Sequence, residues 1–237
     1  MNNYEEQVDL YHNLLFDSKF GKSGRKYLNT RKIKKNTAIF WKLGYLPFNY
    51  LKNNTDYQMK KMEGRITIPI YDSNGILVSI AGRSVYPALK PKYLHYSFPT
   101  STTLFGLYQN KYNIAVKQHA IVTEGQMDVI MSWQNGLDNV VSSFGTKFSY
   151  EHLVLLSRYC DNINILYDAD NAGEIGMNNA KKFSDISDVK INIKKDILLK
   201  DEDLDLFFKE KTLEDFYNIF DDKQRMLQKI KNMKKNF

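Results

Sequence analysis

The sequence has few cysteines and histidines and no long apolar run, which are the features of disulfide-bonded secreted proteins, zinc-binding proteins and membrane proteins. Its 237 residues include one cysteine, Cys160, so no disulfide can form within the chain and a reducing compartment is expected. One cysteine and four histidines assemble no convincing structural zinc site. No apolar run approaches the ~20 residues that span a bilayer, and the polar, acidic beginning is unlike a signal peptide. We therefore expect an intracellular protein without zinc and without a membrane segment.

Glycine and proline are also scarce, with 12 and 5 residues, while 43% of the chain is apolar and 26% is charged. This composition is typical of a folded globular protein and argues against disorder. The length allows one large domain or two modest ones. The net charge of +7 favours a polyanionic partner such as nucleic acid, although many basic proteins bind none.

Two acidic clusters stand where apolar runs end. The run 120–123 ends in Glu124, and the run 163–167 ends in Asp168 and Asp170. Short β-branched runs that lead into helix-like segments are typical of buried parallel strands. Ligand sites of open α/β sheets lie beyond the carboxyl ends of such strands, and carboxylates there can hold divalent cations. An Asp-x-Asp after a single strand is, taken alone, more often a helix cap or a turn.

The segments between and after these clusters continue the same alternation. A strand over 139–143 ends in a turn with Gly145, and a strand over 189–193 leads to Asp203 and Asp205. At a spacing of two in an extended chain, the carboxylates of Asp168 and Asp170 would project the same way. Helices are expected over 127–133, over 150–160 and from Gly173. Asp128, in the first turn of the first of these, either complements the helix dipole or supports the site, and we favour support over direct metal ligation.

The first 117 residues have a different pattern. An amphipathic helix is expected over 4–20, with short helices over 24–28 and 34–41. Residues 65–83 read as a β-hairpin, in which Pro69 predicts an edge position or irregular pairing. Antiparallel pairing brings Arg65 and Arg83 to the same end, where two guanidiniums either bind phosphates or remain solvated strand-end charges.

The ordered motifs of the second half resemble the Toprim domain shared by DnaG-type primases, topoisomerases and some nucleases. The resemblance covers about 118–206. It begins with Glu-Gly-x-x-Asp at Glu124 and continues through both Asp-x-Asp pairs. Upstream, Gly-Arg-Ile-x-x-Pro-Ile at Gly64, Ala-Gly-Arg, Lys-Pro-Lys-Tyr at Lys90 and Leu-Phe-Gly-Leu-Tyr form a succession similar to that of DnaG-type primases. The rival readings are a Toprim nuclease and a non-catalytic nucleic-acid-binding or replisome module.

The resemblance implies an α/β fold in three parts: an N-terminal basic helical and β-hairpin subdomain (1–117), a Toprim domain with a Rossmann-like parallel sheet (118–206) and a C-terminal helical segment (207–237). It also implies RNA primer synthesis from ribonucleoside triphosphates on single-stranded DNA. Glu124, Asp168 and Asp170 would be catalytic, and these three with Asp203 and Asp205 would hold two or more Mg²⁺ or Mn²⁺ ions. The remaining implied roles are nucleotide and template binding (Arg65, Arg83, Lys92, with Lys90 a weaker candidate) and site support (Asp128, Gly125, Gly145, Gly173).

The sequence departs from the family in one motif and in its extent. The Phe-His-Lys-Gly-like turn of the family is missing between Ser97 and Thr103, and Lys111 is the nearest substitute for its lysine. We expect neither a zinc module nor a helicase-binding domain in this chain, so a separate zinc-module protein or a replicative helicase is a candidate partner. The Lys-, Asn-, Ile- and Tyr-rich composition indicates an AT-rich genome, such as that of a phage or mobile element, and a cytoplasmic location in a bacterial or phage-infected cell.

Overall fold

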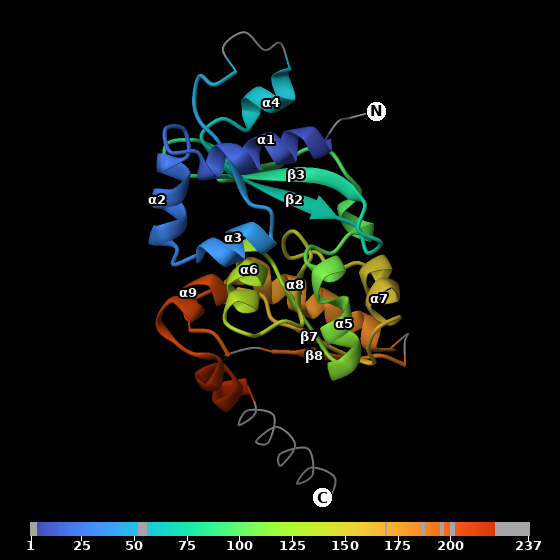
Figure 1. Cartoon of the computed structure of the whole chain (residues 1–237). Helices are drawn as coiled ribbons and strands as arrows, with labels where there is room; N and C mark the ends of the chain where they lie inside the picture. The colour runs from blue at the N-terminus through green and yellow to red at the C-terminus, as the bar shows by residue number, and fades with distance from the viewer. Residues whose placement is uncertain are drawn as a thin grey trace, which may run out of the picture. The chain divides into compact units, whose positions relative to one another are not determined.

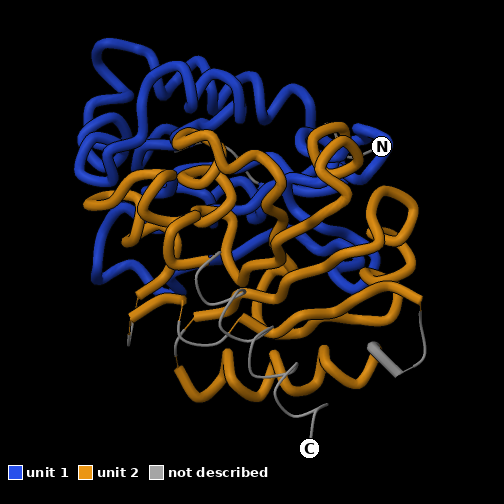
Figure 2. Tube along the Cα trace, turned by 90° about the horizontal axis from the view of Figure 1, so that it is seen from below, with its two compact units in different colours: residues 1–111 blue, residues 112–237 orange. Residues whose placement is uncertain are grey.

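The chain folds into two compact units, residues 1–111 and residues 112–237, which are coloured blue and orange in Figure 2. The structure is a computed structural model (Figure 1). The division of the chain into three parts with boundaries at 117 and 206 stays a prediction. The residues that the structure describes are 4–51, 56–168, 170–185, 188–194, 197–199 and 202–220.

The first unit combines helices with an antiparallel sheet of the order β1-β2-β3-β4. The predicted hairpin is confirmed and is extended by a strand on each side. In chain order the elements are α1 (Tyr4–Phe16), α2 (Lys22–Thr30), α3 (Lys35–Phe40), β1 (Gly44–Leu46), α4 (Tyr57–Lys61), β2 (Arg65–Tyr71), β3 (Leu77–Ser84), β4 (Tyr93–His95) and the 3-10 turn η1 (Thr100–Thr102).

Pro69 lies in β2, which has a neighbour on both sides of the sheet. The short strand β1 pairs only with residues 65–67 of β2, so Pro69 lies beyond the end of β1. On its other side Pro69 stands opposite Ile80 of β3, and the register shifts between Ile70 and Tyr71. A proline without a backbone N–H is accommodated because no strand pairs with that edge at its position.

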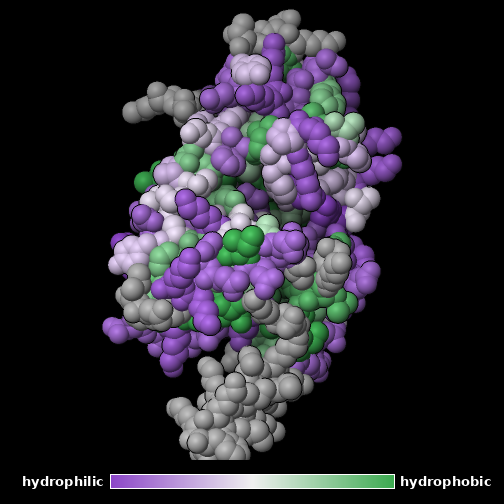
Figure 3. All heavy atoms as spheres, turned by 180° about the vertical axis from the view of Figure 1, so that it is seen from behind, coloured by the Kyte–Doolittle hydropathy of each residue, from purple (hydrophilic) through white to green (hydrophobic). Residues whose placement is uncertain are grey.

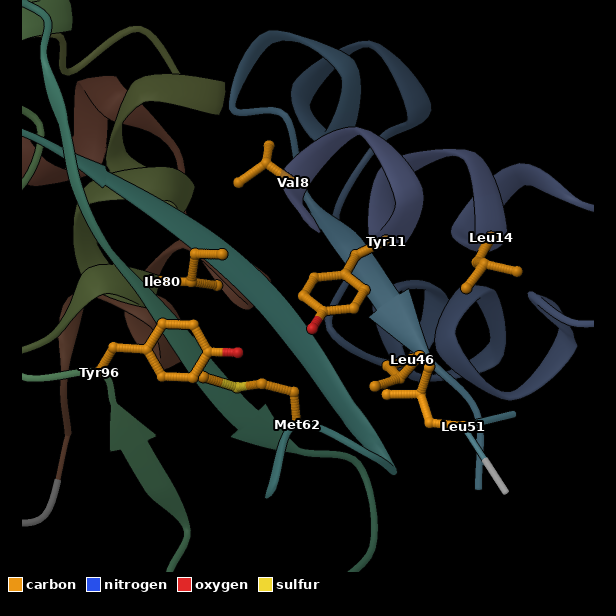
Figure 4. Packing of buried hydrophobic residues seen from close by; sticks show 8 residues of the cluster. All are labelled: Val8, Tyr11, Leu14, Leu46, Leu51, Met62, Ile80 and Tyr96. Carbon is orange, nitrogen blue, oxygen red and sulfur yellow. The ribbon is translucent and has the colours of Figure 1, made fainter. Parts of the chain in front are cut away.

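The core of the first unit lies between α1 and the sheet. Val8, Tyr11 and Leu14 of α1 are buried, and Figure 4 shows them on the side of the helix that faces Ile80 and Tyr96. The spacing of three residues along α1, with Leu15 also buried, is that of one helix face, as the sequence predicted. Within this core the Tyr96 hydroxyl donates to Gln7 Oε1 at 2.9 Å.

The second unit is a parallel sheet flanked by helices. The predicted alternation of strands and helices is confirmed, with the helix α5 (Leu107–Lys117) leading into it. Its elements are β5 (Ala120–Thr123), α6 (Gln126–Gln134), β6 (Val140–Ser142), α7 (Tyr150–Leu156), β7 (Asn162–Ile165), α8 (Asn171–Lys181), the 3-10 turn η2 (Lys182–Asp185), β8 (Lys190–Ile193) and α9 (Leu204–Glu210).

The strand order of this sheet is β6-β5-β7-β8, and all pairs are parallel. The chain leaves β5 to form β6 on one side, then returns to form β7 on the other side of β5. The carboxyl ends of β5 and β7 are therefore neighbours at the point where the winding direction reverses, which is where open α/β sheets bind ligands. The register sets Val122 opposite Ile165, so the residues that follow the two strands emerge together.

The surface is mixed in polarity. Figure 3 shows hydrophilic side chains over most of the viewed face, with hydrophobic side chains in smaller patches between them. No helix in the described ranges has both the length and the apolar character needed to cross a membrane. Within the predicted C-terminal helical segment 207–237, residues 207–210 belong to α9 and residues 213–220 are helical, while residues 221–237 lie outside the described residues.

Candidate active site

Glu124 and Asp168 meet at the carboxyl ends of β5 and β7. The backbone N–H of Asp168 donates to the Oε1 atom of Glu124 at 3.1 Å. Both residues are half-buried. The contact joins positions 44 residues apart, because the parallel pairing continues past the named strands to the bond from Leu166 N–H to the Val122 carbonyl. The structure thus brings together the first acids of the two predicted clusters.

The turn after β6 fixes the backbone of Glu124 from the other side. The N–H of Gly145 donates to the Glu124 carbonyl at 2.9 Å, and the Ser142 hydroxyl donates to the same oxygen at 2.8 Å. Gly145 has a φ of +127°, a conformation that favours glycine. The predicted supporting place of Gly145 near the site therefore agrees with its contact.

A pair of hydroxyl groups that sequence reasoning missed holds this turn. Ser143 Oγ donates to the Gly145 carbonyl at 2.7 Å and lies 2.8 Å from the Tyr167 hydroxyl. Tyr167 is buried immediately before Asp168, so this contact links the turn after β6 to the end of β7. The available signal in the sequence was a hydroxyl residue shortly after each of two strands that flank β5.

Asp170 occupies a different setting from the one its spacing predicted. The strand β7 ends at Ile165, so Asp168 and Asp170 lie in the loop that follows and are not two residues of an extended strand. Asp170 is the N-cap of α8, and its Oδ1 accepts the Gly173 N–H at 2.8 Å. The expectation of two carboxylates on one face of a strand was wrong because the helix start requires a capping acceptor there.

Gly173 lets α8 approach the two acids closely. A Cβ built at this position would overlap the Asp168 carbonyl oxygen and would lie 3.0 Å from Glu124 Oε1. Any side chain here would therefore displace the loop that carries Asp168. This close approach explains why a glycine stands in the first turn of α8, and it agrees with the predicted place of Gly173 beside the site.

Asp128 is a buried connector between two predicted acidic elements. Its Oδ2 accepts the Gly125 N–H at 3.0 Å, and its Oδ1 accepts the Asp205 N–H at 3.2 Å. These bonds join the start of α6 to the first turn of α9. These bonds are compatible with the prediction that Asp128 and Gly125 support the site, which stays a prediction.

The third acidic element forms the beginning of α9. Asp203 is the N-cap and accepts the Leu206 N–H at 2.7 Å. Asp205 is 1% exposed, and its carboxylate forms an ion pair with Lys209 at 3.2 Å. The charge of Asp203 acts on Glu124. The Asp205 carboxylate, by contrast, forms an ion pair within its own helix.

The electrostatics of the cluster are those of crowded negative charge. Burial and the charge of Asp168, followed by those of Asp170 and Asp203, raise the pKa of Glu124 to about 7. Burial and the charges of Asp203 and Asp168 raise the pKa of Asp128 well above its ordinary value. Ionised carboxylates this close repel one another, and a bound cation relieves that repulsion.

The carboxylates at this place suit a hard divalent cation, although they do not form a ready-made coordination shell in the described part of the chain. Carboxylate oxygens are the ligands that Mg²⁺ and Mn²⁺ prefer. In the described part of the chain, no group of three or more His, Cys, Asp or Glu side chains stands ready to hold a metal ion. The site therefore rests on the Glu124–Asp168 contact and on the surrounding charge.

The basic residues predicted to bind phosphate lie in the first unit. Arg65 and Arg83 are 1% and 6% exposed, so neither is a solvated strand-end charge. Arg83 lies over the Tyr93 ring at 4.5 Å. Burial acts to lower the pKa of Arg83, but Tyr93 and Tyr27 outweigh burial, and the pKa is raised above its ordinary value. Lys92 is exposed. Lys111, the suggested substitute for the missing lysine, donates to the Ser73 carbonyl at 2.8 Å.

Residues 121–207 match the sequence model of the Toprim-like family, Toprim_2. Among curated proteins, the chain is 30% identical over 186 residues to a DNA primase of Borreliella burgdorferi and 35% identical over 120 residues to a DNA primase of Aquifex aeolicus. The matched regions cover 67% and 49% of this chain but 35% and 24% of those relatives. The chain therefore spans about a third or less of the length of these proteins.

The fold is similar to solved structures of primase cores. The structure of the DnaG primase catalytic domain bound to ssDNA matches with a TM-score of 0.79 at 25% identity, covering 92% of this chain and 76% of that one. The zinc-binding and RNA polymerase domains of the Aquifex aeolicus primase match with a TM-score of 0.77 at 26% identity, covering 92% and 59%. Both similarities extend well beyond the Toprim-like region.

Proposed function

The chain is a relative of the catalytic core of DnaG-type DNA primases and carries a Toprim-like domain, and on this premise we propose that it synthesises short RNA primers on single-stranded DNA. The substrates would be ribonucleoside triphosphates, and the reaction a metal-dependent nucleotidyl transfer. The observation that carries the proposal is the contact between Glu124 and Asp168 at the carboxyl ends of β5 and β7. That place is the ligand-binding position of the sheet.

The acids would hold two or more Mg²⁺ or Mn²⁺ ions, with Glu124, Asp168 and Asp170 as catalytic residues and Asp203 and Asp205 completing the set. Bound divalent cations supply positive charge that acidifies an attacking hydroxyl and offsets charge on a triphosphate. Gly145 and Ser142 hold the Glu124 backbone in place, and Asp128 fixes the beginning of α9. Such fixed positions are what a phosphoryl-transfer site requires, because its chemistry depends on positioning and charge.

The template and the nucleotides would be held by positive charge. The net charge of +7 favours polyanions, and Lys92 is an exposed cation of the primase-like motif. We place the protein in the cytoplasm, where single-stranded DNA arises at replication forks. A replicative helicase or a separate zinc-module protein would be a candidate partner.

One assay tests the proposal. The protein is incubated with single-stranded DNA, the four ribonucleoside triphosphates and Mn²⁺ or Mg²⁺, and products are resolved on a denaturing gel. Short RNA products are expected. Shortened DNA would identify a Toprim nuclease instead, and DNA that is bound but unchanged would identify a non-catalytic module.

The matched variants are Glu124→Gln and Glu210→Gln, which make the same chemical change at the site and at an exposed position of α9. RNA synthesis should be lost in the first and kept in the second. Equal activity in both variants would mean that Glu124 takes no part in the reaction, and it would overturn the assignment of the acidic cluster as the catalytic site.

A further inference from the structure

The guanidinium of Arg65 is committed to the backbone of its own unit. Arg65 is the first residue of β2 and is 1% exposed. Its Nε donates to the Lys61 carbonyl at 3.0 Å, and its Nη1 donates to the Pro91 carbonyl at 2.8 Å. Two longer bonds of 3.5 Å reach the carbonyls of Gly82 and Lys90. One side chain thus joins the end of α4, strand β3 and the segment that precedes β4.

The neighbouring residues leave a channel for this side chain. A Cβ at Gly82 would lie 2.8 Å from Arg65 Cδ and 2.7 Å from Met62 Sδ. Gly82 stands opposite Thr67 in the β2–β3 ladder, so β3 has no side chain where the stem of Arg65 crosses it. The placement of Arg65 is therefore built into the sheet.

The carbonyls of Lys90 and Pro91, which accept hydrogen bonds from Arg65, belong to the loop of residues 85–92, called here the β3–β4 loop. Its ends are fixed by the bond from Ser84 N–H to the Lys92 carbonyl at 3.0 Å and from Val85 N–H to the Gly64 carbonyl at 3.1 Å. Inside the loop Leu89 N–H donates to the Tyr86 carbonyl at 3.0 Å. Arg65 adds hydrogen bonds to the carbonyls of residues 90 and 91.

The same loop carries cations on its surface. Lys90 and Lys92 are exposed, and Lys90, Lys60 and Lys61 border a cavity of about 570 Å³ whose wall includes Arg65. A guanidinium has five N–H donors, and those of Arg65 point at four carbonyl oxygens. Exposed ammonium groups attract incoming phosphates through their charge.

We propose that Arg65 is a positioning residue that locks the β3–β4 loop, so that Lys90 and Lys92 meet the phosphates and Arg65 does not. The locking is a property of the free protein. The phosphate contacts of the two lysines rest on the proposed function. Burial also lowers the pKa of Arg65, which agrees with a side chain shut away from solvent.

Chemical labelling tests the proposal on the unaltered protein. Phenylglyoxal modifies accessible arginines, and peptide mass spectrometry gives the labelling rate at each one. We expect Arg65 to be labelled at least about tenfold more slowly than an exposed reference such as Arg158, in the same way with and without single-stranded DNA. Fast labelling of Arg65 that DNA blocks would show a phosphate contact and overturn the proposal.

Hydrogen exchange of variants tests the grip itself. Arg65→Lys keeps the charge but cannot reach the carbonyls as a fork, and Arg65→Met removes both. In the ligand-free protein we expect the Val85 and Leu89 amides to exchange about tenfold faster or more in both variants. Lys90→Met, the control in the same loop, should leave this exchange unchanged. Unchanged amide exchange in Arg65→Lys would overturn the proposal. If Arg65→Met fails to fold, the result for the milder variant Arg65→Lys is sufficient to decide.

A binding measurement separates this proposal from the proposed function. If Arg65 acts through the loop, Arg65→Lys weakens single-stranded DNA binding about as much as Arg65→Met does. Lys90→Met then lowers the slope of log K against log salt by about 0.7, the value for one phosphate contact on a single strand. Rescue of binding by Arg65→Lys would overturn the positioning role. If the unaltered protein binds no DNA, the proposed function fails, while labelling and exchange still decide the role of Arg65.

Discussion

At the scale of single residues, Glu124 lies where its charge is costly. It is half-buried, it accepts the N–H of Asp168, and three further carboxylates act on it. A carboxylate is kept in such surroundings for a reason other than stability, because neutral side chains of the same shape would fit with less repulsion. Substitution of Glu124 should therefore lower activity without lowering stability.

Glu124→Gln should lower primer synthesis by about 10²-fold or more, the scale of loss for a charge-stabilising group in an active site. The metal-free variant should melt at the same temperature as the unaltered protein or higher, because the amide oxygen still accepts the Asp168 N–H without the repulsion. Gel assays and thermal melting measure both effects, with Glu210→Gln as the control. A variant that loses activity together with stability would point to misfolding.

The pH dependence of stability should also report on Glu124. Its pKa is about 7 in the folded chain and 4.5 ordinarily, so the folded state binds the proton more tightly. The stability from this group is full below pH 4.5 and is lost as pH rises through 7. Partial exposure screens the charge, and we expect a loss of about 1 kcal/mol, or a fall in Tm of about 2–4 °C.

The measurement for this prediction is the difference in metal-free melting temperature between pH 5 and pH 8. Other groups titrate in the same window, so the test compares the unaltered protein with Glu124→Gln. The variant should show a smaller fall over the range. Parallel curves would mean that Glu124 has an ordinary pKa.

At the scale of elements, the acidic motifs are also the starts of helices. Asp170 caps α8, and Asp203 caps α9, each through a backbone N–H three residues later. A capping residue has a fixed backbone and a fixed side-chain direction, so the helices hold these acids in place. The reading of an Asp-x-Asp as a cap and the reading as a site residue are thus compatible at Asp170.

Gly173→Ala should destabilise the chain although alanine is the better helix former. The new Cβ would overlap the Asp168 carbonyl oxygen, and overpacking of this kind costs about 1–3 kcal/mol. The ordinary helix gain of at most about 1 kcal/mol does not offset it. Primer synthesis should fall as well, since the loop with Asp168 must shift.

Asn178→Ala is the matched control for this prediction, because Asn178 is exposed on the same helix. Chemical unfolding of both variants gives the free energies of unfolding to be compared. The control should equal or exceed the unaltered protein. If Gly173→Ala is as stable as the control, α8 does not approach the loop as closely as the structure has it.

At the scale of the whole molecule, a chain with a net charge of +7 contains a cluster of acids whose negative charges act on Glu124. The two features serve different ligands, since the excess of positive charge favours nucleic acid and the acids favour cations. Folding brings the acids together at a cost in repulsion, so ligands that bind only the folded state should stabilise it strongly.

Mg²⁺ or Mn²⁺ at millimolar concentration should therefore raise the melting temperature. A cation present at about 100 times its Kd adds ~2.7 kcal/mol to the stability of the folded state. Calorimetry or dye-monitored melting checks this against NaCl of equal ionic strength. The Glu124→Gln and Asp168→Asn variants should show a reduced rise. An identical rise with both salts would count against a metal site.

The sequence by itself determined most elements of the second unit and the residues that end them. Alternation of apolar runs with helical patterns is a local property, so the strands before Glu124 and Asp168 could be placed from it. The same local signals gave the β-hairpin of the first unit and the buried face of α1. The short strands β1 and β4 were missed because three residues carry too little pattern and form strands only by pairing with the hairpin.

Only the tertiary structure decided which of these elements are neighbours. The order β6-β5-β7-β8 puts β5 beside β7, and the contact of Glu124 with Asp168 follows from that order. Burial decided that Arg65 serves backbone carbonyls, and helix starts decided that Asp170 and Asp203 are caps. These outcomes depend on contacts between segments far apart in the chain, and the free energy of such contacts is not encoded in the pattern of either segment alone.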